Sequence, residues 1–182
     1  MLKSLSLLTV EDFACLSEGD SHYELAQGRL VVTGLTGGEH GALIVEVGAA
    51  LRAYVAHRQL GMVLLRTGYC LARNPDTVRS PDVSFLRQER IPASGLPRGY
   101  IDGPPDLAVE IVSPGDRAED IEAKVQDYLA YGTRLIWVVQ PRTRTVTVYY
   151  PDGQARVLRG ADRLNGEDVV PGFTLALAEL WG

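Results

Sequence analysis

The sequence of 182 residues is poor in cysteine, in lysine and in long apolar runs. Its two cysteines, Cys15 and Cys70, are too few for a disulfide framework or a structural zinc site, and they indicate a reducing compartment. No stretch approaches the ~18 consecutive apolar residues that a membrane-spanning helix needs. Near the start, Glu11 and Asp12 interrupt the leucines before an apolar segment develops, which makes a poor signal peptide. We therefore expect a cytoplasmic protein with no membrane partner.

Charge and composition bound the class of protein. Hydrophobic residues make up 46% and charged residues 23%, which is typical of a globular chain, and we predict a single domain over residues 1–182. The net charge of -5 alone argues weakly against a broad nucleic-acid coat. However, residues 102–127 hold eight acids and two bases, a net charge of -6, so that the rest sums to +1. The net charge therefore does not exclude DNA as a partner, but it disfavours tight DNA binding without a metal ion.

The spacing of apolar residues predicts a mixture of helices and strands. Helices are expected over residues 9–17, 39–59 and 113–131, and strands over residues 23–25, 28–32, 62–71, 81–86, 106–112, 135–139, 145–150 and 155–158. This order predicts an α/β (α+β-like) domain with a mixed central β-sheet flanked by helices.

Three carboxylates, Glu24, Asp82 and Glu110, interrupt otherwise apolar strand patterns. Glu110 shares one face of its strand with apolar residues, so folding is expected to desolvate its charge unless a cation or several donors lie beside it. Taken alone, Asp82 or Glu24 is also explained as a structural acid in a salt bridge or at an exposed sheet edge, whereas Glu110 fits such a role least. Three together favour a hard divalent cation such as Mg²⁺, which takes oxygen ligands.

Lysine is nearly absent from the chain. Of the 18 basic residues 16 are arginine, and only Lys3 and Lys124 are lysine. Lysine is a compact point charge that can lose its proton when buried, which arginine cannot do. Lys124 is predicted at the flank of the apolar arc of its helix, where either a functional role or a simple pair with Asp120, four residues earlier, fits the spacing.

Other candidate residues carry weaker signals. The three histidines lack metal-ligand spacing, and His40, at the start of the second helix, is more typical of a capping or packing residue. The sequence has no nucleophile elbow, P-loop or dinucleotide fingerprint. Cys70 lies in a strand pattern and is expected in the core.

The order of several short motifs resembles the Uma-type family of proposed endonucleases, which belongs to the PD-(D/E)xK nuclease superfamily. The resemblance spans residues 9–180. The motifs are Tyr23-Glu24-Leu25, Gly28-Arg29-Leu30-Val31-Val32, His40, Ser80-Pro81-Asp82-Val83, Pro105-Asp106-Leu107-Ala108-Val109-Glu110-Ile111-Val112-Ser113-Pro114, Lys124, Tyr128 and Trp137.

The resemblance implies a restriction endonuclease-like fold and a metal site. By this resemblance Asp82 and Glu110 are the metal ligands, Glu24 is an additional acid and metal ligand, and Lys124 is the lysine near the attacked phosphate, with Mg²⁺ or Mn²⁺ as cofactor. One departure is clear: the superfamily places lysine two residues after the second acid, where this chain has Val112. The family pattern moves the lysine to the following helix.

These expectations give a metal-dependent endonuclease that hydrolyses phosphodiester bonds of DNA and forms a homodimer, as superfamily nucleases commonly do. Two alternatives remain open from the sequence. One is an inactive nuclease-fold binding or scaffold module, with a dimer built on the late strands through Trp137 and Tyr149. The other is a metal-dependent hydrolase of a smaller phosphoester.

Overall fold

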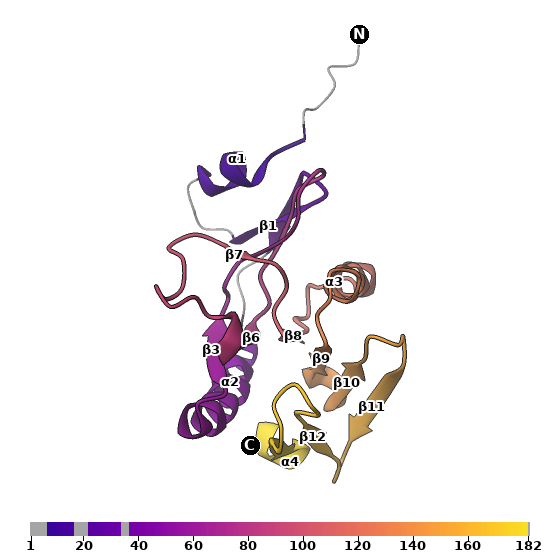
Figure 1. Ribbon diagram of the computed structural model, residues 1–182. Coiled ribbons are helices and arrows are strands. Elements are labelled where there is room, and N and C mark those ends of the chain that lie inside the picture. Colours follow the sequence, from indigo (N-terminus) through magenta and orange to yellow (C-terminus); the bar gives the residue numbers. More distant parts are fainter. Residues whose placement is uncertain (1–6, 17–21, 34–36, 182) are drawn as a thin grey trace.

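The computed structural model describes residues 7–16, 22–33 and 37–181 and has a mixed α/β architecture (Figure 1). Its strands form a six-stranded sheet, a five-stranded sheet and a two-stranded hairpin. In the described part of the chain, the α-helices are α1 (Val10–Ala14), α2 (Gly38–Arg58), α3 (Ala118–Ala130) and α4 (Leu177–Leu180).

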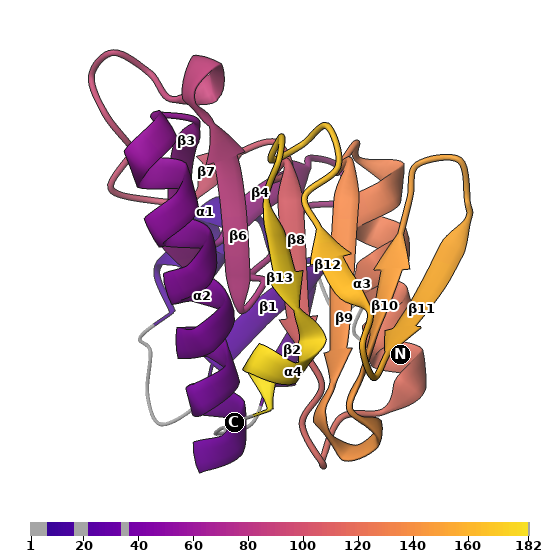
Figure 2. The same ribbon diagram turned by 90° about the horizontal axis from the view of Figure 1, so that it is seen from below.

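The six-stranded sheet has the order β11-β10-β9-β8-β6-β3. It is mixed, because β8 and β9 run parallel whereas the other neighbours are antiparallel. Helix α2 and the C-terminal segment cover one face, and α3 covers the other (Figure 2). The strands are β3 (Gly61–Leu65), β6 (Val83–Arg87), β8 (Leu107–Ile111), β9 (Leu135–Gln140), β10 (Thr145–Tyr149) and β11 (Ala155–Arg159).

The five-stranded sheet has the order β2-β1-β5-β4-β7 and is antiparallel except between β4 and β7. Helix α1, which a reciprocal capping box between Thr9 and Asp12 begins, packs Val10 and Phe13 against this sheet. The strands are β1 (His22–Ala26), β2 (Arg29–Thr33), β4 (Tyr69–Ala72), β5 (Thr77–Arg79) and β7 (Ile101–Asp102), and the hairpin is β12 (Arg163–Asn165) with β13 (Thr174–Ala176).

Strand β8 has two different faces, and this alternation positions the site. Leu107, Val109 and Ile111 belong to the core under α2, whereas Ala108 lies in the core under α3. Because side chains alternate along a strand, Glu110 points to the α3 side with Ala108. The sequence pattern predicted this division correctly.

Several predicted elements differ in their bounds. The strand expected over residues 62–71 is two strands in two sheets, because the chain turns at residues 66–68. The third helix begins at Ala118 rather than at residue 113, since the Ser113 N–H donates to the Asp116 carboxylate (2.7 Å) and closes a turn. The predicted end of the first helix at residue 17 lies outside the described residues. Strands β5, β7, β12 and β13 are two or three residues long, too short for a periodic signal.

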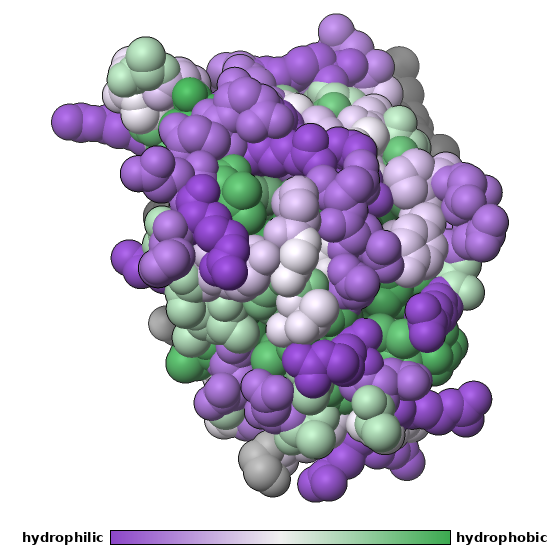
Figure 3. All heavy atoms as spheres, turned by 60° about the horizontal axis from the view of Figure 1, so that its bottom comes forward, coloured by the Kyte–Doolittle hydropathy of each residue, from purple (hydrophilic) through white to green (hydrophobic). Residues whose placement is uncertain are grey.

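Trp137 is a core residue. Its side chain is fully buried and stacks on Phe173 with ring centroids 6.0 Å apart. The idea of a dimer contact through Trp137 is therefore wrong, because the ring has no surface to offer a partner. Polar side chains cover much of the face in Figure 3, with apolar patches between them. No helix within the described ranges is both long and apolar enough to cross a bilayer.

Candidate active site

The two acids of the central sheet lie on adjacent strands. Asp82 comes directly before β6, and the β6–β8 register pairs Val83 with Val109. Continuing this antiparallel register by one residue places Asp82 opposite Glu110. Both carboxylates are buried and line a cavity of about 830 Å³.

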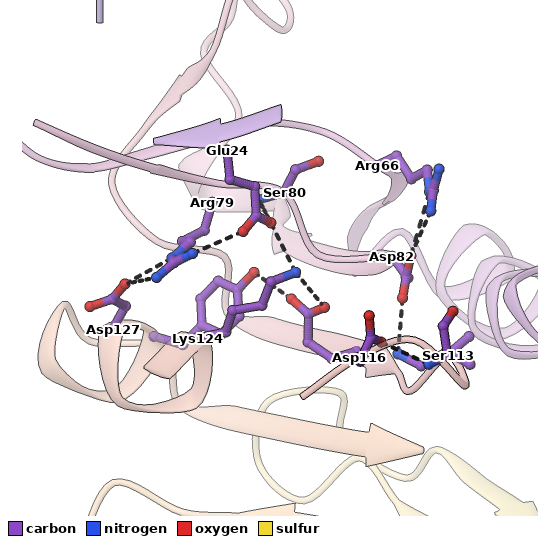
Figure 4. A network of polar contacts seen from close by, with 12 residues as sticks. Glu24, Arg66, Arg79, Ser80, Asp82, Ser113, Asp116, Lys124 and Asp127 are labelled. Carbon is purple, nitrogen blue, oxygen red and sulfur yellow. Dashed lines mark hydrogen bonds and ion pairs between the residues drawn. The ribbon is translucent and has the colours of Figure 1, made fainter. Parts of the chain in front are cut away.

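Lys124 reaches these acids from α3. Its Nζ lies 3.0 Å from Oε2 of Glu110 and 3.0 Å from Oε1 of Glu24, and its side chain is 13% exposed (Figure 4). The alternative pair with Asp120 is not the one formed: the ion pairs of Lys124 within the described residues are those with Glu24 and Glu110. The lysine thus joins a carboxylate of the five-stranded sheet to one of the six-stranded sheet.

Glu24 has a partner for each carboxylate oxygen. Arg79 donates to Oε2 (2.9 Å), while the Ser80 N–H donates to Oε1 (3.1 Å), the oxygen that also contacts Lys124. Arg79 in turn donates to the Asp127 carboxylate of α3 (Nε 2.8 Å, Nη2 2.7 Å). Glu24 is therefore an anchor for three cationic or N–H donors in this structure (Figure 4).

Asp82 is held through one oxygen. Its Oδ2 accepts the Ile111 N–H at 2.9 Å and lies 3.1 Å from Nε2 of His40. Its Oδ1 has only longer contacts, 3.5 Å to Nε and Nη2 of Arg66. Sequence reasoning missed both His40 and Arg66 as partners of the acid. Their separation along the chain leaves no local pattern, although the place of His40 at the start of a long helix was visible.

Tyr128 completes the surroundings of Glu110. Its buried hydroxyl donates to Oε1 of Glu110 at 2.7 Å, while Lys124 contacts Oε2. The sequence offered a usable signal, because Tyr128 follows Lys124 by four residues and so lies on the same side of α3.

Burial dominates the electrostatics of Glu110. Loss of water raises its pKa, to about 7, and the negative charges of Asp82 and Glu24 add to this effect, while Lys124 and the Tyr128 hydroxyl oppose it. Burial alone would lower the pKa of Lys124, but the carboxylates of Glu110 and Glu24 raise it above its usual range. Lys124 therefore keeps its positive charge.

Asp82 is the more acidic of the pair. Burial would raise its pKa, but the hydrogen bond and charge of His40 together with the Ile111 N–H hold it below its ordinary value. Asp82 is thus an anion at neutral pH. Two carboxylates of different basicity face one cavity.

The chemistry of these donors fits a hard divalent cation. Mg²⁺ is commonly held by one or two carboxylates with water completing its shell, and Asp82 and Glu110 supply two oxygen donors whose charges repel each other. Over the described ranges, no group of three histidine, cysteine, aspartate or glutamate side chains is arranged to hold a metal ion by itself. The role of Glu24 as a third ligand remains a prediction, since Lys124 lies between Glu24 and Glu110.

The fold of the chain is shared with a solved structure. A crystal structure described as "a putative nuclease belonging to DUF820 from Anabaena variabilis ATCC 29413" matches with a TM-score of 0.86 and 22% identity, covering 96% of this chain and 97% of that one. At this identity the similarity establishes the fold. No curated protein matches the sequence.

The family model Uma2, described as "Putative restriction endonuclease", matches residues 10–178, and the chain belongs to this family. The expected family and the restriction endonuclease-like fold are both confirmed. Family and fold together support a nuclease-like function.

Proposed function

We propose that the protein is a Mg²⁺-dependent endonuclease that hydrolyses phosphodiester bonds of DNA, with Asp82 and Glu110 as cation ligands and Lys124 as a catalytic cation. One observation carries the proposal: buried Glu110 lies opposite Asp82 and in contact with Lys124 at the wall of a cavity. A structural ion pair alone would need neither the second acid nor the cavity. Mn²⁺ has similar oxygen preferences and is the natural substitute.

In the proposed reaction, the role of each residue follows from its charge and its hydrogen bonds. When bound, the divalent cation supplies positive charge that stabilises the phosphoryl oxygens in the transition state. The Ile111 N–H and His40 fix one oxygen of Asp82, which leaves Oδ1 with the longer contacts to Arg66. The Tyr128 hydroxyl orients Glu110 in the same way. Because Lys124 keeps its proton, it acts through its charge on phosphate oxygens and not as a general base.

The test is cleavage of supercoiled and single-stranded DNA with Mg²⁺ or Mn²⁺. Asp82→Asn, Glu110→Gln and Lys124→Gln are each expected to lower kcat by about a hundredfold or more, the usual effect of losing one preorganised charge. Asp106→Asn is a matched control, because Asp106 is equally buried and pairs with Arg90. Cleavage that survives all three site variants would overturn the assignment.

The two alternatives predict other outcomes of the same assay. A phosphoesterase of smaller substrates cleaves bis(p-nitrophenyl) phosphate and leaves DNA intact. An inactive binding module cleaves neither substrate, shows no thermal shift with Mn²⁺ and releases no heat in calorimetric titration with Mn²⁺. Either result would replace the proposed reaction.

A homodimer and a cytoplasmic location remain predictions. Light scattering coupled to size-exclusion chromatography tests the first: a homodimer has twice the 19.8 kDa of the chain. A mass equal to the single chain would refute it without affecting the proposed chemistry.

A further inference from the structure

Arg66 has the longest contacts among the cationic side chains that contact the candidate acids. Its side chain is 31% exposed and lines the cavity, whereas Arg79 and Lys124 are nearly buried and make contacts of 3.0 Å or less with carboxylates. Both contacts of Arg66 with Asp82 are 3.5 Å. Charge-assisted hydrogen bonds normally measure ~2.7–2.9 Å, so this pair is weakly made.

The backbone fixes Arg66 at this point. Its φ of +46° lies in the left-handed region, which glycine adopts most readily, and its N–H donates to the Asp82 carbonyl at 3.2 Å. Arg66 therefore carries a large side chain at a backbone conformation that favours glycine. Strained positions of this kind cluster at ligand-binding and active sites.

Charge compensation alone does not account for Arg66. Asp82 already has two close donors on Oδ2, the Ile111 N–H at 2.9 Å and Nε2 of His40 at 3.1 Å. The guanidinium lies beside the remaining oxygen, Oδ1, with most of its five N–H groups directed elsewhere. A cation on Asp82 would compete with Arg66 for Oδ1 and repel its charge.

We infer that Arg66 binds a phosphate of the DNA backbone, exchanging its contact with Asp82 for a two-point contact with phosphate oxygens when a divalent cation occupies the site. A guanidinium matches two phosphate oxygens in one plane, which the rounded ammonium of lysine does not. Arg66 is thereby a substrate-binding residue. The inference rests on the proposed function, because that function supplies the phosphodiester.

The experiment measures DNA affinity by fluorescence anisotropy against salt concentration, with Ca²⁺ in place of Mg²⁺ to suppress cleavage. Arg66→Gln is expected to bind about tenfold more weakly, the loss of one charge-assisted contact, and to reduce the salt slope by about 0.9 on duplex or about 0.7 on single-stranded DNA. Arg66→Lys restores the slope but not the full affinity. Arg66→Gly repeats the test with a residue that adopts the left-handed backbone freely.

Arg90→Gln is the matched control, because Arg90 is also 31% exposed and pairs with a buried aspartate, Asp106, outside the cavity. Its affinity and slope should equal those of the unchanged protein. If the unchanged protein cleaves DNA while Arg66→Gln and Arg66→Gly bind with unaltered affinity and slope, Arg66 is only a counter-ion and the inference fails by itself. If the unchanged protein binds no DNA, both the inference on Arg66 and the proposed function fail. Weakened binding without any cleavage would support Arg66 and reject the nuclease.

Discussion

Each oxygen of Glu110 has its own donor, and the two donors come from one helix. Lys124 supplies a charge to Oε2 and Tyr128 a hydroxyl to Oε1. A buried carboxylate costs less free energy when both oxygens are satisfied, so α3 stabilises the acid from two successive turns.

Tyr128→Phe should therefore destabilise the protein by about 1–3 kcal/mol, since it leaves a buried acceptor without its partner. It should also weaken Mn²⁺ binding at neutral pH, because the hydroxyl helps to lower the pKa of Glu110. Urea unfolding and calorimetric titration measure the two effects. Tyr131→Phe, at the C-cap of the same helix and exposed, should change neither. Equal stability of the two variants would show that the hydroxyl contact does not matter.

The sequence predicted the charged residues of the site better than their supports. Glu110 was visible because it interrupts an apolar strand pattern, and Lys124 because 16 of the 18 basic residues are arginine. His40 and Arg66 contact Asp82 across long stretches of chain, and no spacing rule encodes such contacts. The protonation state of Lys124 could not be predicted from the sequence, because it depends on two carboxylates that only the fold places beside it.

Among the elements, α1 depends on a single distant carboxylate. Asp76 accepts the Val10 N–H at the start of the helix (2.7 Å) through one oxygen and the Asn74 N–H (3.0 Å) through the other. These backbone donors, that of Asn74 first, lower the pKa of Asp76 below 3.8. A helix of five residues has little stability of its own, so this contact and the packing of Phe13 hold it on the sheet.

The pH dependence follows from the sign of this shift. The stabilisation by Asp76 is present above pH 3.8 and is lost as the pH falls through the lower folded-state pKa. Asp76→Asn should thus be less stable than the unchanged protein by about 1 kcal/mol at pH 7, with a smaller difference near pH 3, in urea unfolding. Asp152→Asn, whose carboxylate accepts the Gln154 N–H in another turn, is the control. A difference that is independent of pH would contradict the role of the charge.

The bounds of helices and strands were predictable where the pattern of apolar residues is long. The prediction failed where the sequence pattern does not show a turn. Residues 62–71 read as one strand because apolar residues continue through the segment, yet it contributes β3 to one sheet and β4 to the other. The left-handed backbone at Arg66 makes this break, and arginine is not a residue that signals it. At Gly68 the chain passes so close to Tyr100 that a Cβ would lie 2.4 Å from its ring.

At the scale of the whole molecule, acidity is concentrated around the candidate site. Residues 102–127 carry a net charge of -6, whereas the rest of the chain sums to +1. The segment includes Glu110 and most of α3. A polyanion approaching this region meets repulsion, which an added cation would offset in part.

DNA affinity should accordingly rise about tenfold or more, equivalent to ~1.4 kcal/mol, when Ca²⁺ replaces EDTA. Anisotropy titrations at equal ionic strength, with NaCl compensating for the calcium salt, measure this. The same affinity in both buffers would show that the acidic region does not face the DNA. Glu110→Gln should reduce the response to Ca²⁺ if the site is its origin.

The position of Lys124 determines when during folding the candidate site can form. Its two carboxylate partners belong to different sheets, one near the start of the sequence and one past its middle. The constellation therefore exists only after both sheets have docked on α3, and a nascent or half-folded molecule lacks it. The proposed chemistry would therefore begin only when folding is complete.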